Sequence, residues 1–553
     1  MTRPTPLLAV WLLGCGSPTL GPLEKVAGPP PVVDSGTPDS PAFIGDRPEL
    51  RDPLRFFRRA SLDLTGHLPS PAQLDALHAD PTTLDAHLAD LHAHAGLEER
   101  MVHVLDEQWH LRFEALPVGP SDYGFDPELR YALARNMGEE PLRMMARVVS
   151  DDRSWDTIVQ TDTTMATPLL TRVWPMEPVD VPEGEWAPTR WTDHRPAVGV
   201  LASNGFWWRY DTTAFNYNRT RAAAIARLVL CNDYLEFDIE FESPSLTDAE
   251  GTEEAIRTNA SCVACHQTLD PLSSLFFGFW AYDLYDPLEL SRYHPEREPL
   301  GPEYLQVDPA WFGTPVNSLS DLATVVPADR RFPACAVQTF STAMWRRPTT
   351  EDDSTVQESL LAEFEANDRR VWSLLMALTR TRAYVGDLAA EPPDDARPRL
   401  LGPQQLARVL DQTLGFDWHH NGENQLDNDL TGLRVTLGGV DGEEVTAPKA
   451  SPDANLALAW RAVSQAAGRH ALDTLNTGDN PLLPGVTTDS TPDDPAFRDA
   501  LAHAWLWLTA TEATSQQLDD LTELWRVAGA THPREGWVAV VSALLQDPLV
   551  VTY

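Results

Sequence analysis

The stretch Cys262-Val263-Ala264-Cys265-His266 contains two cysteines that are separated by two residues and followed directly by a histidine. This spacing is typical of the attachment site of a c-type haem. Two thiols can bond to the two vinyl groups of one porphyrin when a single turn of backbone separates them, and the adjacent histidine then lies under the iron. The sequence therefore predicts one covalent haem c, bound by Cys262 and Cys265, with His266 as the proximal iron ligand.

Two other interpretations of these five residues stay open. A tetrahedral zinc site usually draws on a second pair of ligands, and the chain has no second Cys-x-x-Cys and no His-x-x-x-His. A thioredoxin-like redox pair would need a strand-helix-strand context, which the surrounding sequence does not offer. Haem is therefore the main prediction, and zinc or a redox pair are the alternatives.

The residues after the motif are expected to shape the haem environment. Pro271 is predicted to make a fixed turn beside His266 and to present its carbonyl to the second ring nitrogen, which would tune the basicity of the ligand. An aromatic group further on is predicted either to exclude water from the porphyrin edge or to fill ordinary core. This group comprises Phe276, Phe277, Phe279 and Trp280.

The sixth iron ligand has only weak candidates. Met344 is the best of them by its position after the motif, although its helical setting is more typical of a core residue. His294 and the His419-His420 pair are weaker candidates, because histidines in polar loops are usually just solvated. The sequence thus names Met344 as a possible distal ligand and leaves its coordination open.

The first fifteen residues predict export. Arg3 precedes an apolar run, residues 7–13, that is too short to span a bilayer. The segment Leu12-Leu13-Gly14-Cys15 resembles the lipobox of bacterial lipoproteins, which implies cleavage of the signal and a lipid anchor on Cys15. An ordinary secretory signal cut at another small residue is the alternative. Either signal takes the chain to a compartment where c-type haem attachment is completed.

The composition excludes some classes of partner. The 553 residues include 82 acidic and 42 basic side chains, giving a net charge of −40. Such a charge disfavours binding to nucleic acid or to anionic lipid. No segment beyond the signal has the long apolar run of a membrane-spanning helix. Membrane attachment is therefore expected only through the lipid.

Two of the five cysteines have no role in the haem site or the anchor. These are Cys231 and Cys335, which flank the haem motif. In an oxidising compartment they are predicted to form a disulfide, which would close a loop of about 100 residues. The alternative is a pair of buried free thiols, because connectivity cannot be deduced from sequence alone.

Hydrophobic periodicity predicts a mostly α, multi-domain helical protein, and the haem motif predicts an embedded cytochrome c-like haem domain within it. A lipoprotein signal peptide (1–15) and a disordered tether rich in Pro, Gly and Ser (16–46) precede three predicted domains. The three are an N-terminal helical domain (47–160), the haem-bearing module (161–390) and a C-terminal helical domain (391–553). Within the second domain, single helices are predicted over about 332–346 and 354–385.

Several segments together resemble a family of large cytochrome c-like proteins from planctomycetes and myxobacteria, built from modules of unknown function. The resemblance in the first part of the chain rests on residues 58–66 followed by Pro69. In the middle it rests on residues 195–201 with Asn218-Arg219, on the haem motif with residues 269–272, and on Cys335 leading to residues 346–349. Towards the C-terminus it rests on Leu400-Leu401, on residues 438–442 and on the closing residues 547–550. It implies an exported haem-containing protein of unsettled substrate. No residue of this chain can be matched to a distal ligand.

These features lead us to expect a lipid-anchored monohaem cytochrome that transfers electrons at the cell envelope, as a periplasmic, outer-membrane or cell-surface lipoprotein. Its partner would be an envelope redox protein or protein complex. The alternatives are a haem-dependent envelope enzyme of peroxidase or oxidase type, and a surface scaffold with an accessory haem. Because no catalytic motif occurs, we expect an electron-transfer protein rather than a stand-alone enzyme.

Overall fold

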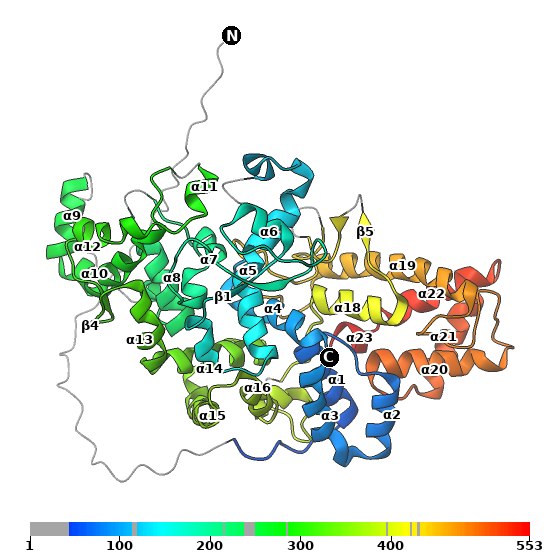
Figure 1. The fold of residues 1–553 in the computed structure, drawn as a ribbon. Coiled ribbons are helices and arrows are strands. Elements are labelled where there is room, and N and C mark those ends of the chain that lie inside the picture. Colours follow the sequence, from blue (N-terminus) through cyan, green and yellow to red (C-terminus); the bar gives the residue numbers. More distant parts are fainter. Residues whose placement is uncertain are drawn as a thin grey trace, which may run out of the picture. The chain divides into compact units, whose positions relative to one another are not determined.

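The computed structural model describes residues 44–112, 119–213, 216–236, 249–283, 286–393, 396–420, 423–428 and 432–553. The predicted signal peptide with Cys15, and the tether up to residue 43, lie outside the described residues. The described chain is mostly helical, as predicted (Figure 1). None of its described helices combines the length and the apolar character that crossing a membrane requires.

The described strands form three small antiparallel pairs. In the longest pair, Thr163 lies opposite Arg190 and Ala166 lies opposite Ala187. The paired strands are β1 (Thr163–Ala166) with β2 (Ala187–Arg190), β3 (Ala310–Trp311) with β4 (Thr314–Pro315), and β5 (His419–His420) with β6 (Glu423–Asn424).

Local signals in the sequence set the ends of the first helices. The Asp52 side chain accepts a hydrogen bond from the backbone N–H of Arg55, and the helix stops at Gly66, whose φ of 75° suits glycine. Ser70 caps the next helix with a full capping box. The helices of this segment are α1 (Pro53–Thr65), α2 (Pro71–Ala79), α3 (Leu84–Asp90), α4 (Gly96–Trp109) and α5 (Arg130–Ser150).

The middle of the chain carries the haem motif on a helix. The prediction of one helix over 354–385 is wrong, because Asp368 and Arg369 adopt left-handed backbone angles and Thr381 caps a new helix. The helices here are α6 (Pro168–Val173), α7 (Asn204–Arg209), α8 (Arg219–Leu230), α9 (Ala249–Thr258), α10 (Ala260–Ser273), α11 (Pro287–Leu290), α12 (Leu300–Leu305), α13 (Leu322–Ala328), α14 (Arg331–Trp345), α15 (Ser354–Ala366), α16 (Val371–Thr379) and α17 (Arg382–Val385).

The last part of the chain packs around its own set of helices. Among them α19 and α22 lie against each other, and α21 packs on α22. They are drawn in yellow to red in Figure 1. The helices are α18 (Pro403–Leu414), α19 (Ala454–Thr477), α20 (Pro495–Thr509), α21 (Ser515–Ala528), α22 (Pro533–Leu544) and α23 (Pro548–Val551).

Two large hydrophobic cores organise the described residues. The first runs from Phe56 of α1 to Ala389 and includes residues on both sides of position 160, where we predicted a domain boundary. The second is formed by residues from Leu400 to Tyr553, together with Leu62 and Leu68 from the first part of the chain. Helix α1 therefore contributes apolar side chains to both cores.

The buried carboxylate of Asp63 on α1 binds side chains from much later in the sequence. Asp63 accepts hydrogen bonds from the hydroxyls of Tyr553, at 2.6 Å, and Tyr384, at 3.0 Å. Arg399 forms an ion pair with the same carboxylate. Gln405 donates from its amide to the Tyr553 hydroxyl at 3.0 Å. We call these five residues the α1 hub.

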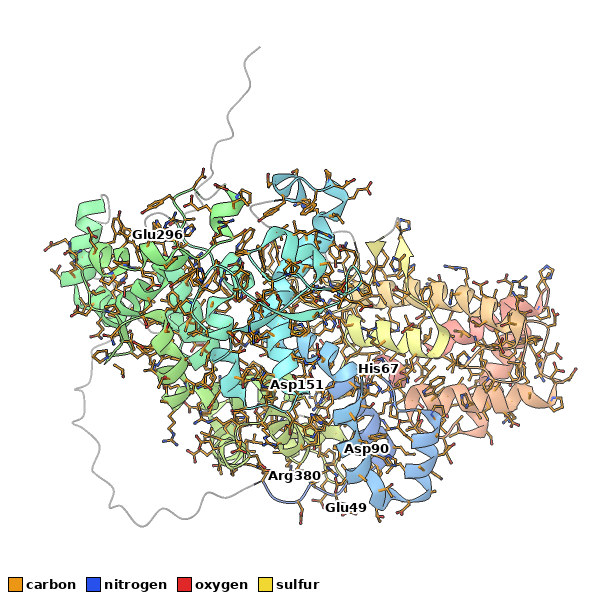
Figure 2. All side chains as sticks on the ribbon, viewed as in Figure 1. Glu49, His67, Asp90, Asp151, Glu296 and Arg380 are labelled. Atoms are coloured by element: carbon orange, nitrogen blue, oxygen red, sulfur yellow. A yellow bond between two sulfur atoms is a disulfide. The ribbon has the colours of Figure 1, made fainter. Side chains whose placement is uncertain are left out.

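Arg58 and Arg59, which precede Asp63 on α1, donate hydrogen bonds to backbone carbonyls. The Arg58 guanidinium donates to Val550, at 3.3 Å, while that of Arg59 donates to Val385 and Tyr553, each at 2.9 Å. Residues 58–66, one of the segments behind the family resemblance, therefore hold α1 against residues from the far end of the sequence. Just beyond them, His67 lies beside the C-terminal helices (Figure 2).

Candidate functional site

Helix α10 carries the complete haem motif and brings its three functional side chains to one side. Residues spaced i, i+3 and i+4 share a helix face, which places Cys262, Cys265 and His266 together. Asn259 starts the helix by accepting a hydrogen bond from the Ser261 backbone N–H at 3.0 Å. Both cysteines are partly exposed and outside any disulfide, and the His266 side chain is 22% exposed. The motif is therefore accessible.

Asp270, held by Arg219, fixes the orientation of the His266 ring. The Nδ1 atom of His266 lies 2.8 Å from Oδ1 of Asp270, one turn further along α10. Arg219, the first residue of α8, binds the same carboxylate through two bonds, from Nε at 2.7 Å and from Nη2 at 2.8 Å. We call His266, Asp270 and Arg219 the α10 triad. Its carboxylate is held from two helices at once.

The electrostatics of the triad determine which ring nitrogen is available. Burial by itself would raise the pKa of Asp270, but hydrogen bonds from Arg219 and His266 outweigh it and lower that pKa. An ionised carboxylate only accepts hydrogen bonds, so the proton of a neutral His266 ring belongs on Nδ1. The lone pair is then on Nε2, which is the arrangement that a metal-binding histidine needs.

The Cys265 thiol is not activated in this environment. Burial, together with the neighbouring Cys262 thiol, raises the pKa of Cys265. A thiol with a raised pKa stays protonated at neutral pH, whereas redox-active cysteine pairs depend on a lowered pKa. The described sheets are all antiparallel pairs, and α10 is preceded by α9 and followed by a 3-10 helix at Ser274–Phe279. A thioredoxin-like role for the pair is therefore disfavoured.

The predicted role of Pro271 is wrong. This residue lies inside α10 rather than in a turn, and its carbonyl accepts a hydrogen bond from the Ser274 hydroxyl at 2.7 Å. The second nitrogen of the His266 ring meets the Asp270 carboxylate instead. The physical reason is that the helix continues past the motif, so the side chain four residues after the histidine faces the ring.

A cavity of about 250 Å³ opens beside the triad. All three triad side chains contribute to its wall, and Tyr217 and Tyr304 form part of the remainder. These tyrosine rings lie 5.9 Å apart in a stacked arrangement. The histidine face of α10 therefore adjoins a hollow with both charged and aromatic walls.

The four aromatic residues after the motif divide into two groups. Trp280 stacks on Tyr217 at 5.8 Å, and Phe277 stacks on Trp280 at 5.1 Å, so both support the wall of this cavity. Phe276 and Phe279 instead pack against Trp207, at 4.9 and 5.7 Å, inside the first core.

The structure does not bring the distal candidates to this cavity. Met344 is 2% exposed and lies in the first core, on α14. His294 faces the backbone carbonyl of Glu289 at 3.1 Å, and His419 pairs with Asp417 at 2.8 Å. The described lining of the cavity contains no methionine and no histidine other than His266.

The predicted disulfide is confirmed. The sulfurs of Cys231 and Cys335 are 2.09 Å apart, and the bond joins the end of α8 to α14. The two residues are 104 positions apart, and the haem motif lies within the loop that they close. Helix α8 is therefore tied to α10 at its first residue by Arg219 and to α14 just past its last residue by the disulfide.

Two residues of this site were not assigned a role from sequence. Asp270 and Arg219 were noted only as parts of longer segments. The spacing of four between His266 and Asp270 was the available signal, and it becomes informative once α10 is known to continue through Pro271. The partner Arg219 lies 51 residues away, and no local pattern indicates it.

Comparison with known proteins adds no relatives to this description. No family model, curated protein or solved structure matches the chain. A search of the described residues for three or more His, Cys, Asp or Glu side chains that could hold a metal ion found no such group.

Proposed function

We propose that this chain is an exported c-type cytochrome that carries one haem on helix α10 and transfers electrons at the cell envelope. The observation that supports it most strongly is the α10 triad beside the two accessible cysteines. A helix that only filled a core would not need an exposed histidine oriented by a carboxylate and an arginine. The embedded cytochrome c-like character of the region around α10 is part of this proposal.

The residues of the site fit covalent attachment. Cys262 and Cys265 lie one helical turn apart and would hold the porphyrin as thioethers, while His266 would bind the iron through Nε2. A bound haem supplies one-electron exchange at its iron. Asp270 and Arg219 are positioning residues, because they fix the orientation of the ring and keep the proton on Nδ1.

We propose a carrier because the sequence has no motif for a catalytic nucleophile or a nucleotide. The described wall of the cavity beside His266 supplies no sixth iron ligand, since it contains no second histidine and no methionine. We further propose that a lipid on Cys15 anchors the chain, and that an envelope redox protein or complex is its partner. A net charge of −40 would favour a partner with a basic docking face.

The covalent haem is tested by spectroscopy of the purified full chain from an export-competent host. Reduced-minus-oxidised spectra and haem staining after denaturing electrophoresis should both show covalent haem c. Cys262→Ala with Cys265→Ala should abolish both signals. The matched control, Cys231→Ser with Cys335→Ser, also removes two cysteines and should keep them. An absence of the band from the wild-type chain would overturn the proposal.

A further inference from the structure

A second cavity, of about 800 Å³, is more than three times as large as the one beside His266 and shares no lining residue with it. Its walls come from α1, the ends of α4 and α14, and α17, together with the described residues of 393–400 and with 446–450. Sites for organic ligands typically measure about 300–1,000 Å³. The cavity therefore has the size of a small-molecule site.

The charge of this cavity is opposite to that of the chain. Acidic side chains outnumber basic ones in the sequence by 82 to 42, yet the described lining contains Glu107 as its one acidic residue. Asp394 and Asp395 lie outside the described residues, so this statement concerns the described wall. The basic side chains of that wall, apart from histidine, are Arg59, Arg346, Arg347, Arg382, Arg397, Arg399 and Lys449.

Ion pairs hold several of these cations in place. Arg346 binds Glu107 at 2.8 Å, and Arg347 binds Asp353 at 2.7 Å. Behind the wall, Arg59 pairs with Asp387, and Arg399 pairs with Asp63 of the α1 hub. Carboxylates therefore fix these guanidinium groups and balance their charge.

Arg382 differs from the other cations. It is exposed at the start of α17, and none of the described residues forms a hydrogen bond or an ion pair with its side chain. Apolar surface lies in the same cavity, including Trp345, Pro348 and Leu400. The cavity thus combines an unneutralised cation with an apolar wall.

From this combination we infer that the cavity binds an organic anion, whose carboxylate, phosphate or sulfonate group pairs with Arg382 and whose apolar body rests against Trp345 and Pro348. Guanidinium groups bind such anions through charge-assisted hydrogen bonds, and the apolar wall favours an anion that carries an apolar body. This site does not depend on the haem, because no residue of the α10 triad lines it.

An adjoining cavity extends the space that is open to the ligand. It measures about 310 Å³ and shares Gln108, His110, Thr342 and Thr446 with the larger one. Along α14 it reaches Gln338, and its far wall includes Cys231 of the disulfide. A ligand that filled both cavities would extend from Arg382 towards the disulfide that connects α8 and α14.

The test uses two fluorescent probes that share their aromatic rings and differ in charge. Anilinonaphthalene sulfonate carries the anion and phenylnaphthylamine does not. Titration of the purified full chain should show saturable binding of one sulfonate probe per chain, with an affinity at least about tenfold above that of the neutral probe. Equal affinity for the two probes, or only unsaturable binding, would overturn the inference.

Charge reversal locates the site. Arg382→Glu should weaken binding of the sulfonate probe by about tenfold or more, because it replaces an attraction with a repulsion. The matched control is Arg461→Glu on α19, which reverses the charge of another exposed arginine outside the cavity and should leave the affinity unchanged. Equal effects of the two variants would show that only net charge matters and would contradict the assignment. Neither outcome depends on the covalent haem.

Discussion

The α10 triad and the α1 hub are built from the same chemistry but differ in what they leave exposed. In each, a carboxylate on a helix is paired with an arginine from a distant part of the sequence. In the hub, Asp63, Tyr384 and Tyr553 are all buried. In the triad, His266 remains 22% exposed with only Nδ1 engaged by the carboxylate. The triad therefore leaves one imidazole nitrogen outside its carboxylate contact, whereas the carboxylate of the hub is enclosed by its partners.

The largest expected effect comes from breaking the hub. Asp63→Asn would leave the buried Arg399 guanidinium without its counter-charge, which costs about 3–5 kcal/mol of unfolding free energy. Urea unfolding followed by tryptophan fluorescence measures this loss. Asp85→Asn, which removes an exposed ion pair with Arg47, should cost at most about 1 kcal/mol. Equal costs for the two variants would show that the α1 hub does not stabilise the packing of α1 against the C-terminal residues.

Removal of the disulfide should have a smaller effect on stability. The disulfide lies just past the last residue of α8, whereas Arg219 of the triad is the first residue of that helix. Cys231→Ser with Cys335→Ser should lower the unfolding free energy by about 2–4 kcal/mol, because the unfolded chain loses the constraint of a long closed loop. The haem spectrum should stay unchanged, since the triad contacts do not involve these sulfurs. If the double variant unfolded at the same urea concentration as the oxidised wild type, the disulfide would add no stability.

The smallest effect on stability is expected at the triad itself. Asp270→Asn should cost only about 1 kcal/mol at pH 7, because its partners are partly exposed. Its effect on the haem should be larger. A neutral partner makes the His266 ring a weaker donor, so the reduction potential should rise, by about 59 mV for each tenfold change in the relative stability of the two iron states. A merely structural carboxylate would leave the potential unchanged.

The stability effect of Asp270 should also depend on pH. The pKa of Asp270 is lowered in the folded chain, so its contribution is complete above the unfolded value of about 3.9 and disappears as pH falls through the folded pKa. The difference in unfolding free energy between the wild type and Asp270→Asn should therefore be constant near neutral pH and vanish in strong acid. Urea titrations across this pH range measure it. A difference that grew on acidification would have the wrong sign.

Features that depend on short stretches of sequence could be predicted. The mostly helical character follows from hydrophobic periodicity and propensity over short stretches. The disulfide followed from a different argument, because Cys231 and Cys335 were the two cysteines left without a role. The sequence patterns mispredicted helix ends at two places. Helix α10 continues through Pro271, where a turn was predicted, and the helix predicted over 354–385 is broken at Asp368.

The sequence by itself determined which side chains could hold a haem, because two thiols and an imidazole at this spacing share one turn of backbone. Only the tertiary structure decided what surrounds them. The pair of Asp270 with Arg219 spans 51 residues, and that of Asp63 with Tyr553 spans 490. Such pairs form because helices pack and exclude water, so their partners and their burial depend on the whole core rather than on any local pattern.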